Sequence, residues 1–191
     1  MQKNYNIAGC RFSLAVMSDD YVPKILNALK AVDTSHIWSF TDLLSTTYLG
    51  HKTNVINTLK ELFIAVNDNK THITLEITLS KENSNKSIDD IQTRITPTTN
   101  RLSNQNFDVC GKIAFYPMGT LDYMNHISHI INLAIEANIC DKPSYYATQI
   151  RGDVQNLFDY FHEIFDYADK HIEHFIYQIT LSINSPTTKK N

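Results

Sequence analysis

The stretch Ile77-Thr78-Leu79-Ser80 decides the fold, because it recurs as Ile179-Thr180-Leu181-Ser182 at the end of a second copy of one sequence pattern. Residues 20–80 align without a gap with residues 122–182, about 102 positions further along the chain. A repeat of about 75 residues is longer than the 20 to 50 residues of a solenoid unit, so we predict two copies of one small domain. The other identities are Asp20/Asp122, Tyr21/Tyr123, Thr46/Thr148, Gly50/Gly152, Asn54/Asn156, Glu61/Glu163, Phe63/Phe165 and His72/His174.

The spacing of apolar residues predicts the order strand, helix, strand, strand, helix, strand in each copy. Alternating apolar residues predict strands over residues 10–16 and 71–80, and a 3.6-residue spacing predicts helices over 20–32 and 53–66. Two short strands, 36–40 and 43–49, are expected to form a hairpin that turns at Thr41-Asp42 and ends at Gly50. In the second copy the expected strands are 110–116, 139–142, 145–151 and 173–183, and the expected helices are 121–137 and 154–169.

This order is that of the ferredoxin-like fold, an α+β architecture in which both helices cover one face of an antiparallel sheet. We therefore predict a tandem repeat of two ferredoxin-like βαββαβ domains, at residues 8–80 and 107–185, joined by a polar linker over 81–106. The helix-free face of each sheet carries small, polar and charged residues. Such a face is typical of solvent exposure or of a contact between copies or subunits, and a small ligand at its rim is compatible with both.

The composition argues against nucleic acid and against a membrane span. The 17 basic and 20 acidic residues give a net charge of −3 and form no run of like charge, whereas binding of a phosphate backbone needs clustered Lys and Arg. Three cysteines without paired spacing predict neither a disulfide framework nor a zinc ribbon, and they favour a reducing compartment. No apolar run approaches the roughly 18 residues that span a bilayer, so we expect a cytoplasmic location.

No recognisable catalytic or metal-binding pattern is present, so a binding protein is preferred over an enzyme. The sequence has no Gly-rich phosphate loop and no nucleophile elbow, and the recurring carboxylates are interpreted as a helix cap and a helix surface. The histidine pairs His126/His129 and His171/His174 lack the further ligands that a zinc site needs. We therefore predict no metal and no cofactor.

Several longer strings resemble a known family. They are G-C-R-F-S-L-A-V-M-S-D-D from Gly9, V-D-T-S-H-I-W-S-F-T-D-L-L-S-T-T-Y-L-G from Val32, F-Y-P-M from Phe115, L-D-Y-M from Leu121 and L-S-I-N-S-P from Leu181. Together they resemble the YkoF family, bacterial proteins that bind thiamine and its hydroxymethylpyrimidine (HMP) moiety, and the resemblance covers almost the whole chain. It implies a homodimer, a thiamine or HMP ligand bound without chemistry, and a supporting role in uptake or handling of the thiamine precursor, with a possible functional link to a transporter.

The same resemblance implies where the ligand contacts lie. They are carried over to the first strand of each copy, at Ser13, Leu14, Ala114 and Phe115, to the third strand, at Ser45, Thr46, Ala147 and Thr148, and to the strand exits at Met17 and Met118. An aminopyrimidine needs an apolar slot with a few oriented hydrogen-bonding groups, which strand backbone and a threonine hydroxyl supply.

The thiazolium cation of thiamine favours a nearby aromatic ring or carboxylate. Trp38 and Asp42 fit that need in the first copy, whereas the second copy has Cys140 and Ser144 there, with Tyr145 and Tyr146 close by. We therefore expect two sites of different affinity. Two alternatives stay open: a regulatory sensor of the ACT type that binds an amino acid between domains, and an enzyme that acts on a pyrimidine.

Overall fold

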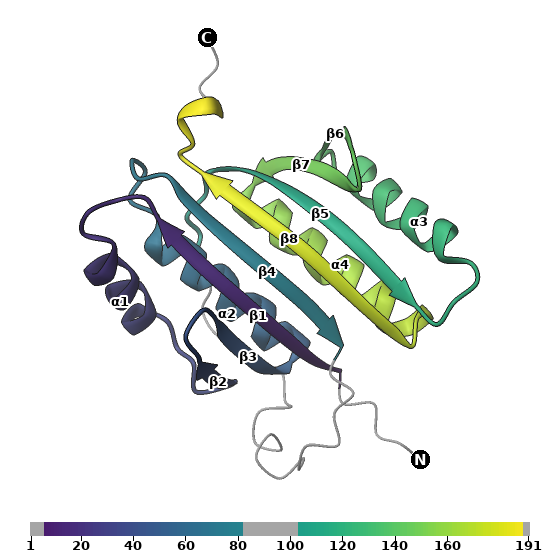
Figure 1. Cartoon of the computed structure of the whole chain (residues 1–191), viewed down its shortest axis with the longest axis horizontal. Helices are drawn as coiled ribbons and strands as arrows, with labels where there is room; N and C mark the ends of the chain where they lie inside the picture. Colours follow the sequence, from purple (N-terminus) through teal and green to yellow (C-terminus); the bar gives the residue numbers. More distant parts are fainter. Residues whose placement is uncertain (1–5, 82–102, 189–191) are drawn as a thin grey trace.

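The computed structural model describes residues 6–81 and 103–188, and it confirms two βαββαβ units (Figure 1). The first unit consists of β1 (Ile7–Val16), α1 (Tyr21–Ala31), β2 (Trp38–Thr41), β3 (Thr46–His51), α2 (Lys52–Val66) and β4 (Ile73–Lys81). The second consists of β5 (Asp108–Met118), α3 (Tyr123–Glu136), β6 (Cys140–Ser144), β7 (Ala147–Asp153), α4 (Val154–His171) and β8 (His174–Ile183), followed by the 3₁₀ helix η3 (Pro186–Thr188). Residues 82–102 of the predicted linker lie outside the described residues.

The two units share one eight-stranded antiparallel sheet, in the order β2-β3-β1-β4-β8-β5-β7-β6. They meet edge to edge through β4 and β8, where Ile77 pairs with Ile179. These two isoleucines are equivalent positions of the repeat, so an approximate twofold axis passes through the seam. Figure 1 shows β4 and β8 side by side at the centre of the sheet, with α2 and α4 behind it.

A single apolar core lies between this sheet and the helices. The alternating residues Ile73, Leu75, Ile77 and Leu79 of β4 are buried, as are their counterparts in β8. Side chains of α2 and α4 meet over the seam around a void of only about 10 Å³, too small to be more than a packing gap. The helix-free face of the sheet, which we call the open face, is therefore shared by both repeats. Of the alternatives for this face, a sheet-on-sheet contact between the two copies of one chain does not occur, because their edges pair instead.

The hairpin between the short strands differs from the sequence prediction in two respects. Gly50 does not end it, because Gly50 lies within β3 and pairs with Ala8 of β1. The strand continues to His51, whose Nδ1 accepts a hydrogen bond from the Thr53 backbone N–H at 3.3 Å and so caps α2. The turn lies two residues later than predicted, at Leu43-Leu44, where the Asp42 N–H donates to the Ser45 carbonyl at 2.9 Å.

Candidate functional site

A cavity of about 310 Å³ lies between α3 and the sheet in the second repeat. We call it the helix-side cavity. Its volume is at the lower end of the range found for small-molecule sites. Five of the six residues that the sequence predicted for this repeat line it. The lining residues are Ile113, Ala114, Phe115, Ile127, Ile130, Ile131, Cys140, Tyr146, Ala147 and Thr148.

The walls of the helix-side cavity are apolar. Ile127, Ile130 and Ile131 have the spacing i, i+3, i+4, which places all three on one side of α3, against the sheet. Phe115 of β5 forms the opposite wall, and its ring stacks on Tyr177 with the ring centroids 4.5 Å apart. Because Tyr177 is fully buried, this stack holds the Phe115 ring in place.

Thr148 places a hydroxyl in this apolar setting. It pairs with Ile113, a buried core residue, so its side chain lies on the helix side of the sheet. On its other flank it pairs with Pro143, which has no hydroxyl to offer. The equivalent Thr46 pairs instead with Thr41, and the two hydroxyl oxygens are 3.0 Å apart. The hydroxyl of Thr46 thus lies within hydrogen-bond distance of another hydroxyl. The residue opposite Thr148 is a proline, which has no hydroxyl to pair with.

The mouth of the helix-side cavity carries an exposed aromatic ring. Tyr146 is 98% exposed and has a φ of 60°, a left-handed backbone conformation that is uncommon for a bulky residue. It is the second of two residues between the paired Ser144 and Ala147, a hairpin turn in which positive φ is usual. A bulge between Cys140 and Lys142 shifts the register of β6, so that Cys140 pairs with Ile150 and lines the cavity.

The residues predicted for the first repeat lie on both faces of the sheet. Leu14 packs against the core on the helix side, and Thr46 lies on that side as well. Ser13 lies on the open face, where its hydroxyl donates to the Leu44 carbonyl at 2.9 Å. Ser45 also faces this side, in the hairpin that Leu44 belongs to. The equivalent residues of β5 alternate in the same way, because Ala114 pairs with Gln178 and Phe115 pairs with the buried Tyr177.

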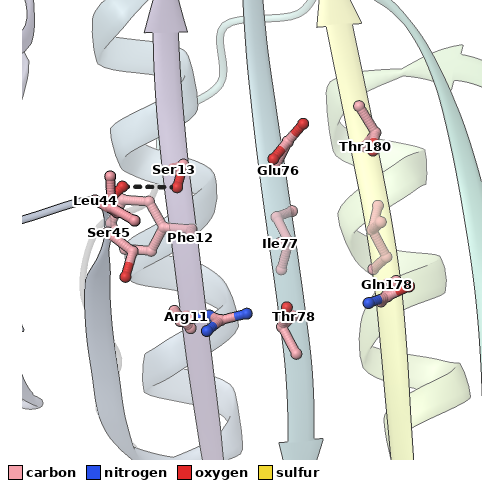
Figure 2. Close-up of a pocket in the computed structure, with 11 residues that line it drawn as sticks. Arg11, Phe12, Ser13, Leu44, Ser45, Glu76, Ile77, Thr78, Gln178 and Thr180 are labelled. Atoms are coloured by element: carbon pink, nitrogen blue, oxygen red, sulfur yellow. Dashed lines mark hydrogen bonds between the residues drawn. The ribbon is translucent and has the colours of Figure 1, made fainter.

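Ser13 and Ser45 line a second cavity of about 430 Å³, the open-face groove. Figure 2 shows two rows of side chains across β1, β4 and β8, with Arg11, Thr78 and Gln178 in one row and Ser13, Glu76 and Thr180 in the other. The groove crosses the seam between the repeats, and Leu44 overhangs it through the Ser13 hydrogen bond. Its floor is polar, in contrast to the apolar walls of the helix-side cavity.

The two residues expected to meet a thiazolium cation in the first repeat have other contacts. Trp38 pairs with Leu49 on the open face and stacks on Phe40, with the ring centroids 5.9 Å apart, so it lies on the other side of the sheet from Thr46. The Asp42 carboxylate accepts the backbone N–H groups of Leu44 and Ser45 at 2.8 Å. These hydrogen bonds lower the pKa of Asp42 and fix the turn.

Met17 and Met118 lie at the ends of β1 and β5 and are 57% and 42% exposed. Neither lines the helix-side cavity or the open-face groove. The structure thus brings together Ala114, Phe115, Tyr146, Ala147 and Thr148, and it separates Met118 from them. The sequence reasoning missed the three isoleucines of α3, although their helical spacing was visible.

Three of the four histidines in these pairs, His126, His129 and His171, pack their rings against Tyr167. The Tyr167 hydroxyl and His126 Nδ1 are 2.8 Å apart, and the His129 ring stacks on Tyr167 at 4.0 Å. Among residues 6–81 and 103–188, no three His, Cys, Asp or Glu side chains gather as metal ligands would. None of the helices in these residues is long and apolar enough to cross a membrane.

Sequence comparison agrees with the repeat. The profile of the YKOF-related family matches residues 7–86 and 108–188, one match for each unit. The chain belongs to this family. A relative from Bacillus subtilis (strain 168), named as a candidate HMP/thiamine-binding protein, YkoF, is 29% identical over an alignment of 188 residues, which covers 96% of this chain and 93% of the relative.

Among solved structures, an aldoxime dehydratase in complex with butyraldoxime aligns with 97% of this chain and 85% of its own, at 9% identity and a TM-score of 0.24. Similarity at this level carries no argument about either fold or activity. The assignment to the YKOF-related family therefore rests on the two profile matches.

Proposed function

We propose that this YKOF-related protein binds thiamine and its HMP moiety, with the pyrimidine ring in the helix-side cavity, and releases the ligand unchanged. The observation that carries the proposal is the cavity itself: isoleucines and a phenylalanine form its walls, and Thr148 places a hydroxyl inside it. The name of the B. subtilis relative supports the ligand class. The protein needs no cofactor for this role.

The cavity suits a flat heterocycle with a polar edge. The α3 isoleucines and Phe115 offer apolar surface to the two faces of the ring. The Thr148 hydroxyl can donate to a ring nitrogen or accept from the exocyclic amino group, because a hydroxyl carries one donor and two acceptor positions. In thiamine the thiazolium follows the pyrimidine toward solvent, where the Tyr146 ring offers a face to the cation.

The proposal is tested by isothermal titration calorimetry of thiamine and HMP against the full chain. Thr148→Val keeps the shape of the side chain but removes the hydroxyl, so we expect binding to weaken by about 0.5–1.5 kcal/mol, roughly twofold to tenfold. Thr46→Val is the matched control, because its hydroxyl is paired with Thr41. Unchanged binding in Thr148→Val, or equal weakening in both variants, would contradict the placement.

A second measurement separates binding from chemistry. Mass spectrometry of the ligand recovered after incubation should show intact thiamine and intact HMP. An altered pyrimidine would favour the enzyme alternative, and saturable heat with an amino acid but with neither pyrimidine would favour the sensor alternative. We expect neither result.

We further propose a cytoplasmic homodimer that supports uptake or handling of the thiamine precursor. The open face is compatible with a subunit contact, because none of the helices in residues 6–81 and 103–188 covers it (Figure 1). Sedimentation velocity should give twice the mass of the chain, and a monomer at micromolar concentration would contradict the dimer. Slower growth on limiting HMP after gene deletion would support the handling role.

A further inference from the structure

A third cavity, of about 610 Å³, lies at one end of the open face, and neither thiamine nor HMP accounts for it. Ser182, Cys110 and Arg151 form one row across β8, β5 and β7, since Ser182 pairs with Cys110 and Cys110 pairs with Arg151. The loop before β4 and the segment after β8 close the cavity at its ends. The lining residues are Asn69, Lys70, His72, Phe107, Asp108, Cys110, Arg151, Ser182, Asn184, Ser185 and Pro186.

The charges that line this end cavity are mostly positive, although the chain as a whole has a net charge of −3. Lys70 and Arg151 are cationic, and Asp108 is the one carboxylate among the lining residues. Arg151 Nη2 is 3.8 Å from Asp108 Oδ2, which is beyond hydrogen-bond distance. In residues 6–81 and 103–188 the Lys70 ammonium group forms no ion pair. Both cations therefore have donors to offer to a ligand.

The polar groups around these cations are held in place before any ligand arrives. The Asp68 carboxylate accepts the backbone N–H of Lys70 at 2.9 Å and that of Thr71 at 2.7 Å, which fixes the loop. The Asn184 side-chain amide donates to the Thr71 carbonyl at 3.0 Å, and His72 Nε2 lies 3.0 Å from the Ser182 hydroxyl. Such preorganisation lowers the ordering cost of binding.

The repeat provides an internal control for the two cations. The position equivalent to Lys70 is Ile172, and the position equivalent to Arg151 is Leu49. Both counterparts are buried aliphatic residues, 4% and 7% exposed. The cationic pair is thus not part of the duplicated core pattern, and both of its members line the same cavity.

We propose that the end cavity binds a small phosphate dianion, either inorganic phosphate or a phosphate monoester. Arg151 supplies a planar guanidinium that matches two phosphate oxygens, and Lys70 supplies a point charge. His72, Ser182 and the Asn69 side chain add polar groups at the rim of the cavity, whereas the Asn184 amide already donates to the Asn67 side chain and the Thr71 carbonyl. The end cavity opens on the open face, whereas the helix-side cavity lies beneath α3, so this proposal does not depend on the thiamine site.

The test is a titration of the full chain with inorganic phosphate at constant ionic strength, followed by ¹H–¹⁵N NMR. We expect saturable shifts at residues 69–72, 108–110 and 151. Lys70→Ile and Arg151→Leu install the residues of the other repeat, and each should weaken phosphate binding by roughly tenfold. Asp108→Asn should strengthen it. Lys30→Ile, which makes the same charge change on exposed α1, should leave it unchanged.

The variants that remove a positive charge and the variant that removes the negative charge have opposite expected effects on phosphate binding, so a general loss of structure cannot imitate the result. Methyl phosphate is titrated in parallel: tighter binding than inorganic phosphate identifies a monoester site, and weaker binding identifies a site for the free ion. Shifts that stay linear up to high phosphate for both ions, or equal weakening in Lys30→Ile and Lys70→Ile, would overturn the proposal. Thiamine binding should be the same in Lys70→Ile as in the wild type, which keeps the two sites distinguishable.

Discussion

Tyr146 combines an unusual backbone conformation with a position at the mouth of the helix-side cavity. Its ring is almost fully exposed at a φ of 60°, a conformation that costs a bulky residue of order 1 kcal/mol or more and that Asn tolerates better. Retaining a tyrosine here is understandable if its ring meets a ligand. The sequence alone gave the residue type at this turn but not its backbone conformation, because the register of β6 depends on the bulge after Cys140.

Tyr146→Asn should therefore weaken the binding of thiamine but not that of HMP. The substitution keeps the turn and removes the aromatic face, so we expect thiamine to bind about threefold to tenfold more weakly while HMP, which lacks the thiazolium cation, changes little. Calorimetry with both ligands on wild type and variant measures this. Tyr145→Asn, at the neighbouring exposed position, is the control. Equal loss of HMP and thiamine in Tyr146→Asn would show that the ring does not meet the cation.

Gly111 in β5 marks a close approach between strands. A Cβ built there would lie 2.7 Å from the Thr180 carbonyl oxygen and 2.8 Å from Leu181 Cδ2, and the first of these is backbone that the sheet holds in place. We expect Gly111→Ala to lower the free energy of unfolding by about 1–3 kcal/mol, through overpacking. Gly152→Ala is a milder control, because its nearest contact is the end of the Ile139 side chain at 3.0 Å. Thermal unfolding of both variants gives the comparison, and an unchanged midpoint in Gly111→Ala would be the contrary result.

At the scale of elements, strict alternation and helical spacing were enough to predict all four helices and the long strands. The short edge strands were less accurate, because the residues that decide their limits act through space. Asp42 fixes the hairpin of the first repeat by accepting N–H groups two and three residues later. His51, rather than Gly50, ends the strand by capping α2. The predicted site residues Ser13 and Leu14 lie on opposite faces of β1, as strand alternation requires.

The contact between α2 and α4 contains a partly buried histidine and should make stability depend on pH. His162 Nε2 is 2.9 Å from Asn57 Oδ1, and burial lowers the pKa of His162, with the charge of Lys60 adding to the effect. The unfolded chain, with an ordinary histidine pKa of about 6.5, takes up the proton first as the pH falls. The stabilisation is thus complete above pH ~6.5 and is lost as the pH falls from there toward the lower folded pKa.

Urea unfolding at pH 7.5 and pH 5.5 measures this dependence. We expect the wild type to lose more unfolding free energy than His162→Gln over this interval, because glutamine can keep the hydrogen bond to Asn57 without titrating. Burial also lowers the pKa of His51, which gives the same sign, so the difference between wild type and variant isolates His162. An identical decrease in both proteins would assign the pH dependence to other groups.

At the scale of the whole molecule, the duplication was readable from the sequence but the way the copies join was not. The alternating pattern of Ile73, Leu75, Ile77 and Leu79 defines which face of β4 is buried, yet it is silent about whether the strand edge is free or paired. Pairing β4 with β8 removes two edges that would otherwise be open to aggregation. It also puts α2 against α4, so that both small cores become one.

The joined core leads to a prediction about cooperativity. A domain of about 75 residues buries little surface alone, and each repeat here would lose its seam strand partner and its helix contact if the other unfolded first. We therefore expect one transition in guanidinium chloride. The single tryptophan, Trp38, lies in the first repeat and reports only that unit by fluorescence, whereas far-UV circular dichroism reports both. The fluorescence and circular dichroism curves of the wild type should coincide in midpoint and slope.

The seam itself is tested by a variant. In the seam variant Ile179→Asp, which places a carboxylate in the buried row opposite Ile77, the curves should separate or the midpoint should fall steeply. Gln178→Asp is the control on the exposed face, because its cross-strand neighbours Thr78 and Ala114 are uncharged, and it should change neither. Separate fluorescence and dichroism transitions in the wild type would mean that the repeats fold independently.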